Sequence, residues 1–414
     1  MYDVIIVGAG PGGSYTAKLL AQAGYEVVLL EKDSIPRDKP CAGWITPKVL
    51  DLLGMSPSKL NCFQPMNGAV LWLPERDKLT PYTVTYTKPV SYGIRRIEFD
   101  TAITNEAKDA GAEVLDSTFV TNVYRQKKAV FVQAKDNQEF KGRFVIGADG
   151  THSIVAKDLW LRRRWTPSEL IQCLVSETEI GDKTQDLTNY YGFPEIFFNF
   201  KAGGYSWFYT KSTFVSIGLG IQLSKVTPTC NSKTIYQELL QTLNKLNHLQ
   251  GIDLAPVKAH TYPTIYGPYH YPTYGDRVLL IGDAGGFPIN FSGEGIRTAL
   301  LTGKFAAETL MIALEEGHKD LRAYHNKWSR ALRNEYLLGD VFQMCFSPAY
   351  YEMIKYLFIE EKRFRKLFLD LFFNRKKPRQ ALRQLLFYSP LLASRFIRFS
   401  FRSIIKDFTS FLNV

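Results

Sequence analysis

Apolar residues near the start of the chain form an unbroken run and then recur at helical spacing. The run Val4–Val7 predicts a strand that is covered on both faces, as in a parallel sheet. A helix face follows, made by Ala17, Leu20 and Ala21. A second predicted strand, Glu26–Leu30, completes the pattern of a strand–helix–strand unit.

Two later apolar runs also end in glycine-rich turns. Phe144–Ile146 leads into "GADG" at residues 147–150, and Ser153 can cap or begin the next helix. The run "RVLLI" at residues 277–281 leads into "GDAGGFPINFSGEG", after which helical spacing begins at Ile296. Between these two regions, "YSWFYTK" has the aromatic content and alternation of a β-strand.

The composition is that of a globular chain, with 45% apolar and 22% charged residues among 414. This length favours two or three domains. The five cysteines are scattered and none forms a Cys-x-x-Cys pair, so neither a disulfide framework nor a metal site is expected. No apolar run reaches the roughly 18 residues of a membrane-spanning helix. The first strand begins so early that no signal peptide is expected, and the sequence predicts a cytoplasmic protein.

The net charge of +11 is concentrated near the C-terminus. Residues 351–414 contain fourteen Lys or Arg and five Asp or Glu. Because the rest of the chain is nearly neutral, a nucleic-acid-binding surface is not expected.

The first glycine-rich turn has the spacing of a dinucleotide site, Gly8-x-Gly10-x-x-Gly13. Gly8 allows the tight turn, Gly10 lets the backbone approach a pyrophosphate, and Gly13 lets the helix pack against the strand. Glu31 follows the second strand and can accept hydrogen bonds from ribose hydroxyls. An acid at this position favours FAD or NAD over NADP.

All three glycine-rich turns together resemble the signatures of FAD enzymes with the p-hydroxybenzoate hydroxylase fold. The resemblance implies that Asp283 holds the ribityl chain. It also implies that the helix beginning at Gly295 and Ile296 points its positive end at the flavin ring, where it would stabilise negative charge. No second GxGxxG follows a strand, so no separate site for a resident NADPH is expected.

Residues 34–54, "SIPRDKPCAGWITPKVLDLLG", resemble a run typical of the geranylgeranyl reductase family. Ala42 and Trp44 depart from the glycines that are usual there. "RRIEFD" is similar to the family's "RxxFD", which implies that Arg96 contacts the cofactor, and "YSWFYTK" is similar to its "YxWxFPK" substrate motif. Cys41 would lie beside the flavin, either as a proton donor or as a packing residue.

The resemblance therefore implies two sets of site residues and no metal ligands. The candidate cofactor-binding residues are Gly8, Gly10, Gly12, Gly13, Glu31, Lys32, Arg37, Cys41, Ala42, Arg96, Asp149, Asp283, Gly293, Gly295 and Ile296. The candidate substrate residues are Trp44, Tyr205, Trp207 and Lys211, and Cys41 is the candidate catalytic residue.

The implied activity is reduction by FAD of isoprenoid double bonds in a lipid, quinone or chlorophyll precursor. The external electron donor would be NADPH, reduced flavin or an acidic carrier such as ferredoxin. A flavin monooxygenase or halogenase is the first alternative, although only Trp207 answers to the halogenase "WxWxIP" segment. A flavin electron-transfer or lipid-carrier protein is the second alternative.

The C-terminal region is aromatic, basic and helical in pattern. Residues 356–373 mix Leu and Phe with Lys and Arg, and residues 397–412 form an apolar helix face. A second stripe is made by Arg395, Arg398, Arg402 and Lys406. A membrane surface and a helical cap with a solvated basic face both fit this pattern, and a lipid substrate favours the membrane.

The expected fold is α/β, with a doubly wound Rossmann-like FAD domain, an inserted mixed β-sheet substrate domain and a helical C-terminal region. The FAD domain is predicted to comprise residues 1–72, 95–160 and 275–325. The substrate domain is predicted at 73–94 and 161–274, and the helical region at 326–414.

Overall fold

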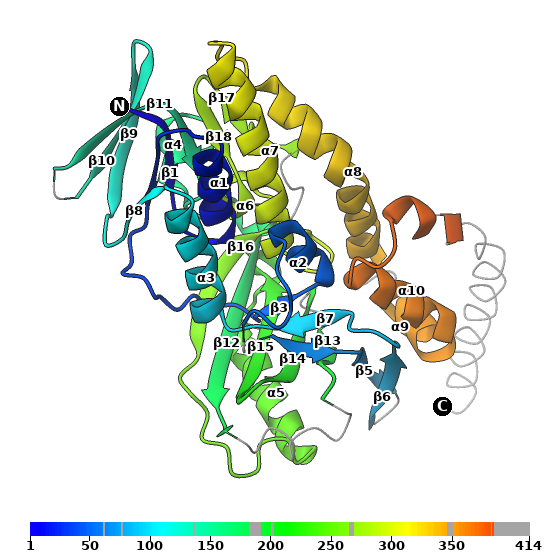
Figure 1. Cartoon of the computed structure of the whole chain (residues 1–414). Helices are drawn as coiled ribbons and strands as arrows, with labels where there is room; N and C mark the ends of the chain where they lie inside the picture. The colour runs from blue at the N-terminus through cyan, green and yellow to red at the C-terminus, as the bar shows by residue number, and fades with distance from the viewer. Residues whose placement is uncertain are drawn as a thin grey trace, which may run out of the picture.

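The computed structural model describes residues 1–60, 63–75, 78–135, 137–181, 192–199, 203–264, 269–345, 351–381 and 383–384. Two large sheets, one small sheet and a set of helices make up this part of the chain (Figure 1).

The first sheet has eight strands and contains the βαβ unit at the start of the chain. Its central strands, from β18 through β11, β1 and β2 to β8, are parallel. Strands β9 and β10 extend the antiparallel part of β11. The strands are β1 (Tyr2–Val7), β2 (Val27–Leu30), β8 (Glu113–Leu115), β9 (Val120–Gln126), β10 (Ala129–Ala134), β11 (Glu139–Gly147), β17 (Tyr274–Gly275) and β18 (Val278–Leu280).

Both faces of this sheet are buried, which explains the continuous apolar run in β1. Val4 and Ile6 belong to the core cluster that contains residues of α1 and α7. Ile5 and Val7 belong to the opposite cluster, beneath β9, β10 and α4. The observed strand β1 is longer than the predicted strand Val4–Val7, because Tyr2 also pairs with Gly142 of β11.

The second sheet has seven strands in the order β16-β12-β15-β14-β13-β5-β6, and a three-stranded sheet has the order β3-β7-β4. The strands of the larger sheet are β5 (Gly68–Glu75), β6 (Lys78–Thr85), β12 (Leu170–Glu179), β13 (Glu195–Asn199), β14 (Gly204–Lys211), β15 (Phe214–Gln222) and β16 (Lys258–Pro263). Those of the smaller sheet are β3 (Trp44–Ile45), β4 (Gln64–Met66) and β7 (Ser91–Gly93).

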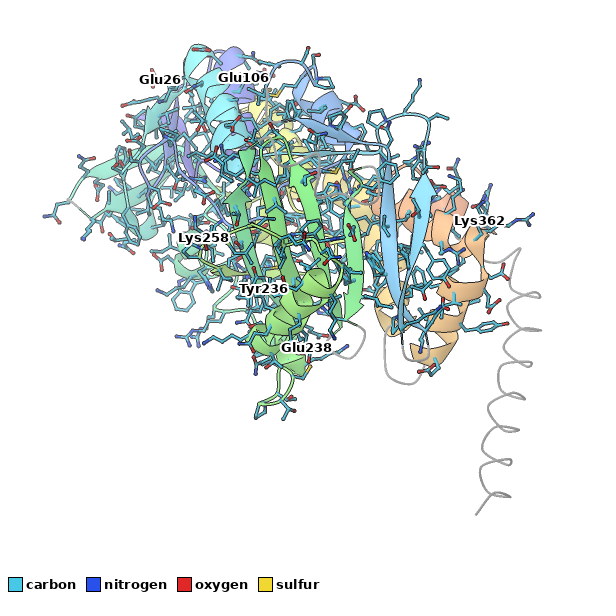
Figure 2. All side chains as sticks on the ribbon, turned by 90° about the horizontal axis from the view of Figure 1, so that it is seen from below. Glu26, Glu106, Tyr236, Glu238, Lys258 and Lys362 are labelled. Atoms are coloured by element: carbon cyan, nitrogen blue, oxygen red, sulfur yellow. The ribbon has the colours of Figure 1, made fainter. Side chains whose placement is uncertain are left out.

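Helices lie against each sheet. They are α1 (Pro11–Gln22), α2 (Pro47–Leu53), α3 (Arg96–Asp109), α4 (Ile154–Asp158), α5 (Ser232–Lys245), α6 (Gly282–Gly285), α7 (Ile296–Glu315), α8 (Arg322–Cys345), α9 (Tyr351–Glu360) and α10 (Lys362–Phe372). Two 3₁₀ turns are η1 (Pro167–Glu169) and η4 (Leu223–Lys225). Figure 2 shows α5, which carries Tyr236 and Glu238, lying across the strands of the seven-stranded sheet.

The predicted fold class is confirmed for the part of the chain that the structure describes. The predicted strand in "YSWFYTK" is β14, and the predicted helix from Ile296 is α7. The proposed domain division between residues 72 and 73 falls inside β5, all of which belongs to the seven-stranded sheet. We therefore place that division before Gly68.

The apolar sides of α9 and α10 are covered by the protein itself. Leu357, Phe358 and Phe368 are buried in one cluster with Leu71 and Ile196 of the seven-stranded sheet. Of the two interpretations of residues 356–373, the helical cap therefore describes them, and their buried apolar side is not offered to a membrane. Residues 397–412 and the stripe from Arg395 to Lys406 lie outside the described residues.

Within the described ranges, no helix combines the length and apolar character needed to cross a bilayer.

Phe358 tests whether this cap is part of the folded core. Its side chain is fully buried, and its ring centroid lies 5.1 Å from that of Phe198 and 4.9 Å from that of Phe368. We expect Phe358→Ala to lower the free energy of unfolding by about 3–5 kcal/mol, measured by denaturant titration. The control Leu337→Ala alters a side chain that is 50% exposed, and we expect a change within about 0.5 kcal/mol. Equal stability of Phe358→Ala and the parent would contradict burial of the cap.

Candidate functional site

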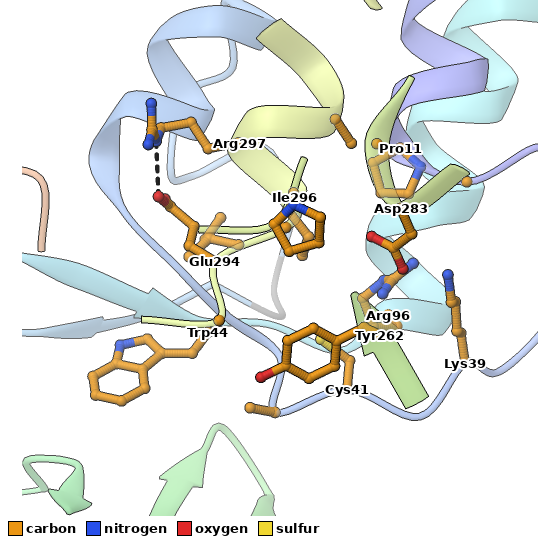
Figure 3. A pocket seen from close by; sticks show the side chains of 18 of the residues that line it. Pro11, Lys39, Cys41, Trp44, Arg96, Tyr262, Asp283, Glu294, Ile296 and Arg297 are labelled. Atoms are coloured by element: carbon orange, nitrogen blue, oxygen red, sulfur yellow. Dashed lines mark hydrogen bonds and ion pairs between the residues drawn. The ribbon is translucent and has the colours of Figure 1, made fainter. Parts of the chain in front are cut away.

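A cavity of about 1330 Å³, part of it open to solvent, lies where segments of both large sheets meet. Its wall is built from the turn before α1, residues 39–46, the first residue of α3, strands β12, β14 and β16, and residues 281–299. Phe372 and Phe373, at the end of α10, complete it. This space is called the front cavity below. Figure 3 shows that its wall includes Cys41, Lys39, Arg96, Tyr262 and Asp283.

The first glycine turn leaves the start of α1 open toward the cavity. Gly10 is the N-cap residue, no side chain caps the helix, and a Cβ on Gly10 would meet no atom within 4 Å. By contrast, a Cβ on Gly8 would overlap the carbonyl oxygen of Ala148, and one on Gly13 would overlap that of Gly8. Gly8 and Gly13 are therefore required by packing, whereas Gly10 preserves space beside free helix N–H groups, which suit a phosphate.

Glu31 is buried behind this turn rather than in the cavity wall. Its carboxylate accepts a hydrogen bond from Ala9 N at 2.9 Å and lies 3.2 Å from Arg37 Nε. Arg37 also lies 3.2 Å from Asp100 Oδ2 and donates to Ala9 O at 3.0 Å. The ion pair of Glu31 with Arg37 thus holds Ala9, in the first glycine-rich turn, through its N–H and C=O groups. Lys32, the next residue after Glu31, is exposed. A contact of Glu31, Lys32 or Arg37 with a cofactor remains a prediction.

Asp149 lies at the start of α4, outside the front cavity. Its Oδ2 accepts hydrogen bonds from Ile154 N at 2.8 Å and Val155 N at 3.1 Å. Burial raises the pKa of this carboxyl above its ordinary value, although hydrogen bonds from Ser153 and the backbone oppose the shift. The predicted cap by Ser153 is confirmed, since its side chain accepts from Ala156 N. Ala148 and Gly150, on either side of Asp149, line the cavity.

A second helix start faces the cavity at the third glycine-rich turn. Asp283, Gly293, Gly295 and Ile296 all line it. Gly295 is the N-cap residue of α7, without a capping side chain, and the first turn of α7 carries no acid. The helix dipole is therefore available to an anionic group bound in the cavity.

Cys41 has a cationic neighbour that could not be identified from the sequence. Its Sγ accepts a hydrogen bond from Gly43 N at 3.3 Å, and Arg96 lies within hydrogen-bonding reach of it. Arg96 is buried and donates through Nε and Nη2 to the two carboxylate oxygens of Asp100, each at 2.7 Å. Burial alone would lower the pKa of Arg96, but Asp100 outweighs that effect and raises it. Arg96 is therefore a fixed positive charge beside the thiol.

Strand β16 contributes His260 and Tyr262, which the sequence analysis did not identify. Burial, reinforced by the charge of Lys39, lowers the pKa of His260 to about 4, so the imidazole is neutral near pH 7. Burial raises the pKa of Tyr262, so its phenol stays protonated. The two rings stack with centroids 6.0 Å apart. The strand sequence "KAHTYP" has no glycine or charge pattern that would have indicated a site.

Trp44, Tyr205 and Trp207 line the cavity as the substrate prediction requires, together with Ala42. Trp44 packs in an aromatic cluster whose ring centroids lie 5.5 Å away in Tyr209 and 5.3 Å away in Phe372. Lys211 does not reach the cavity. It is 1% exposed, donates to Ile94 O at 3.1 Å and pairs with Glu177 at 2.6 Å. Its ammonium packs closely against Gly43 of the loop that carries Cys41.

The residues present fit the flavin dinucleotide that the sequence motifs imply. Two helix starts without capping side chains, those of α1 and α7, face one cavity. Two buried donor or acceptor atoms in its wall, Trp44 Nε1 and His260 Nδ1, lack a hydrogen-bond partner. Buried polar atoms without partners are costly, which is consistent with a bound polar group. No cluster of His, Cys, Asp or Glu suited to a metal occurs among the described residues.

Comparison with known proteins agrees with this geometry. Residues 1–332 match the family model of the FAD binding domain. The digeranylgeranylglycerophospholipid reductase 1 of Methanopyrus kandleri is 30% identical over 352 residues, which are 81% of this chain and 88% of that protein.

Two solved structures share the fold. A geranylgeranyl bacteriochlorophyll reductase-like protein from Thermoplasma acidophilum has a TM-score of 0.75 at 18% identity, covering 89% of this chain and 99% of its own. A flavin-dependent brominase has a TM-score of 0.71 at 19% identity, covering 94% and 99% of the two chains. At these identities the likeness concerns the fold alone.

A substitution at Gly10 tests cofactor binding independently of folding. We expect Gly10→Val to fold with a thermal midpoint near that of the parent, because its side chain enters open space, but to lose FAD because it occupies the place of the pyrophosphate. Flavin absorbance per polypeptide and the melting curve of the apoprotein measure both properties. Gly13→Val is the matched control and should lower the apoprotein midpoint, since its side chain overlaps the backbone. A Gly10→Val protein that retains full FAD content would refute this assignment.

Proposed function

Because this chain belongs to the FAD-binding family that includes digeranylgeranylglycerophospholipid reductase, we propose that it reduces carbon–carbon double bonds of a geranylgeranyl-type chain. The substrate is a prenylated lipid-like molecule, and FAD is the cofactor. Electrons are supplied by NADPH, free reduced flavin or an acidic carrier such as ferredoxin. We also propose a cytoplasmic protein that works at a membrane surface.

The observation that carries this proposal is a cluster of contacting aromatic side chains in the cavity wall. Trp44, Tyr205, Trp207, Phe372 and Phe373 line one side of the front cavity. A hydrocarbon chain has no hydrogen-bonding groups, and moving it from water onto such a surface lowers the free energy. Asp283, Lys39 and Arg96 lie across the cavity from Trp44, whereas the ion pair of Glu294 with Arg297 lies on the same side as Trp44 (Figure 3).

The proposed cofactor contacts combine the two helix starts with the roles predicted for Asp283 and Glu31. The N–H groups beside Gly10 would hold the pyrophosphate, Asp283 the ribityl chain and Glu31 the adenosine ribose. The start of α7 would stabilise negative charge at the flavin ring. Bound FAD, once reduced, supplies the hydride that one alkene carbon receives.

The second alkene carbon must receive a proton, and in this proposal Cys41 donates it. Its thiol lies beside Arg96, whose positive charge would stabilise the thiolate left after proton transfer. Solvent would then reprotonate the sulfur. The buried Tyr262 phenol is another protic group in the same wall. The aromatic residues exclude water from the alkene and orient it.

A flavin monooxygenase or halogenase is the second candidate, because a brominase shares the fold. A flavin electron-transfer or lipid-carrier protein is the third. These candidates differ in what happens to reduced flavin when oxygen is absent.

We expect the dithionite-reduced protein to be reoxidised anaerobically by a prenyl lipid, with a product heavier by two hydrogens for each bond reduced. Flavin absorbance and mass spectrometry of the lipid fraction measure both changes. A saturated lipid of the same head group is the control and should leave the flavin reduced. No anaerobic reaction, with hydroxylated or halogenated product once oxygen is admitted, would instead support a monooxygenase or halogenase.

Cys41→Ala tests the proton-donor role. A general acid typically contributes on the order of 10²–10⁴ in rate, so we expect the anaerobic reoxidation rate to fall by that factor while FAD content is retained. Cys230→Ala, which changes a free thiol outside the front cavity, should leave the rate unchanged. An unchanged rate in Cys41→Ala would leave Cys41 as a packing residue and make Tyr262 the next donor to test.

A further inference from the structure

A second cavity, here called the rear chamber, adjoins the front cavity on the far side of two tyrosines. It has a volume of about 750 Å³, part of it open to solvent, between the seven-stranded sheet and α10. Tyr205, Tyr262, Gly293 and Phe372 line both spaces, so these four residues form the partition between them. The rear chamber is therefore an extension of the proposed substrate site.

The wall of the rear chamber combines apolar side chains with the polar residues Gln222, Lys225, Thr264 and Asn290. Ile171, Phe198, Phe291 and Phe368 form much of its wall. Among its described lining residues there is no Asp or Glu, and Lys225 is the one residue with a formal charge. A space that combines apolar side chains with a single cation suits a molecule that has a hydrocarbon body and an anionic end.

Lys225 is the last residue of η4 and packs closely on the turn before β14. A Cβ on Gly203 would lie 2.6 Å from Lys225 Nζ, so the ammonium rests directly on this glycine. No carboxylate of the described residues forms a salt bridge with it. Burial lowers the pKa of Lys225, and no described residue opposes that shift. A partly buried ammonium that has no counter-ion among the described residues favours the binding of an anion.

Thr264 supplies a second group without a partner. Its side chain is 1% exposed and lines the rear chamber, and its hydroxyl makes no hydrogen bond in the described structure. The amide of Gln222, on the same wall, already donates to Ser168 O at 3.3 Å. Buried hydroxyls normally have a partner, and a bound acceptor such as a phosphate oxygen would satisfy this one.

We propose that the rear chamber binds the phosphate end of the substrate, with Lys225 as the charged contact and Thr264 as a hydrogen-bond donor. The prenyl chain then passes between Tyr205 and Tyr262 into the front cavity. This assignment rests on the proposed function and narrows it, because a prenyl quinone carries no anionic group for Lys225. Phosphate could belong to a prenyl diphosphate or to the head group of a phospholipid.

The test compares Lys225→Gln with the parent on three substrates: geranylgeranyl diphosphate, a phospholipid with geranylgeranyl chains, and uncharged geranylgeraniol. Losing a charge-assisted contact should raise KM roughly tenfold to a hundredfold for the phosphate-bearing substrate that the site accepts, relative to KM for geranylgeraniol. Lys225→Arg should retain most of the affinity. Lys233→Gln removes an exposed lysine from α5 and is the matched control, expected to leave every KM unchanged.

Equilibrium binding of geranylgeranyl diphosphate and of the phospholipid, followed by tryptophan fluorescence, separates this proposal from the reaction itself. Weaker binding to Lys225→Gln than to the parent supports the phosphate site even if no substrate is reduced, which would refute only the proposed function. The compound whose affinity falls identifies the source of the phosphate. Equal KM ratios and equal affinities in the parent and Lys225→Gln would overturn the proposal while leaving reduction of prenyl chains in place.

Discussion

The close crossing of α1 and α7 is the constraint on which the whole site depends. The two helices are separated by more than 270 residues in sequence but pack closely against each other. A Cβ on Gly12 would lie 2.9 Å from Ala299 O, and one on Gly303 would lie 2.9 Å from Gly12 O. Only glycines allow this approach, and the approach brings both helix starts to one cavity. A long ligand with a phosphate at one part and a ring at another can therefore be held by two dipoles at once.

Buried ion pairs then connect this helix pair to the loop that carries Cys41. Asp100 of α3 lies close to Arg37 and binds Arg96, and Arg37 in turn reaches Glu31 and the first glycine turn. Such a network costs desolvation free energy unless each charge is paired, as these are. Its effect is to fix the position of the Cys41 loop relative to the start of α1. The thiol and the proposed pyrophosphate site are thus parts of one rigid frame.

The sequence predicted what local patterns encode. The βαβ unit, the turn residues Gly8 and Gly13, and the start of α7 are visible because glycine spacing and apolar runs have direct geometric consequences. It could not predict His260 and Tyr262, whose strand joins the site only through its pairing with β12. Phe372 and Phe373 were missed for the same reason, because their contacts with Trp44 depend on tertiary packing. Lys211 was predicted to contact the substrate, but its ion pair with the partly exposed Glu177 holds it outside the cavity.

Helix α10 forms part of both cavity walls, yet it lies beyond residue 332, where the match to the family's FAD-binding model ends. Enclosure of the substrate site therefore extends beyond the stretch of the chain that matches the FAD-binding model. Mutations in α9 and α10 can reshape the space around a prenyl chain without touching the glycine turns or the crossing of α1 and α7. Substrate preference can therefore change through substitutions in α9 and α10 while the residues proposed to bind the cofactor stay the same.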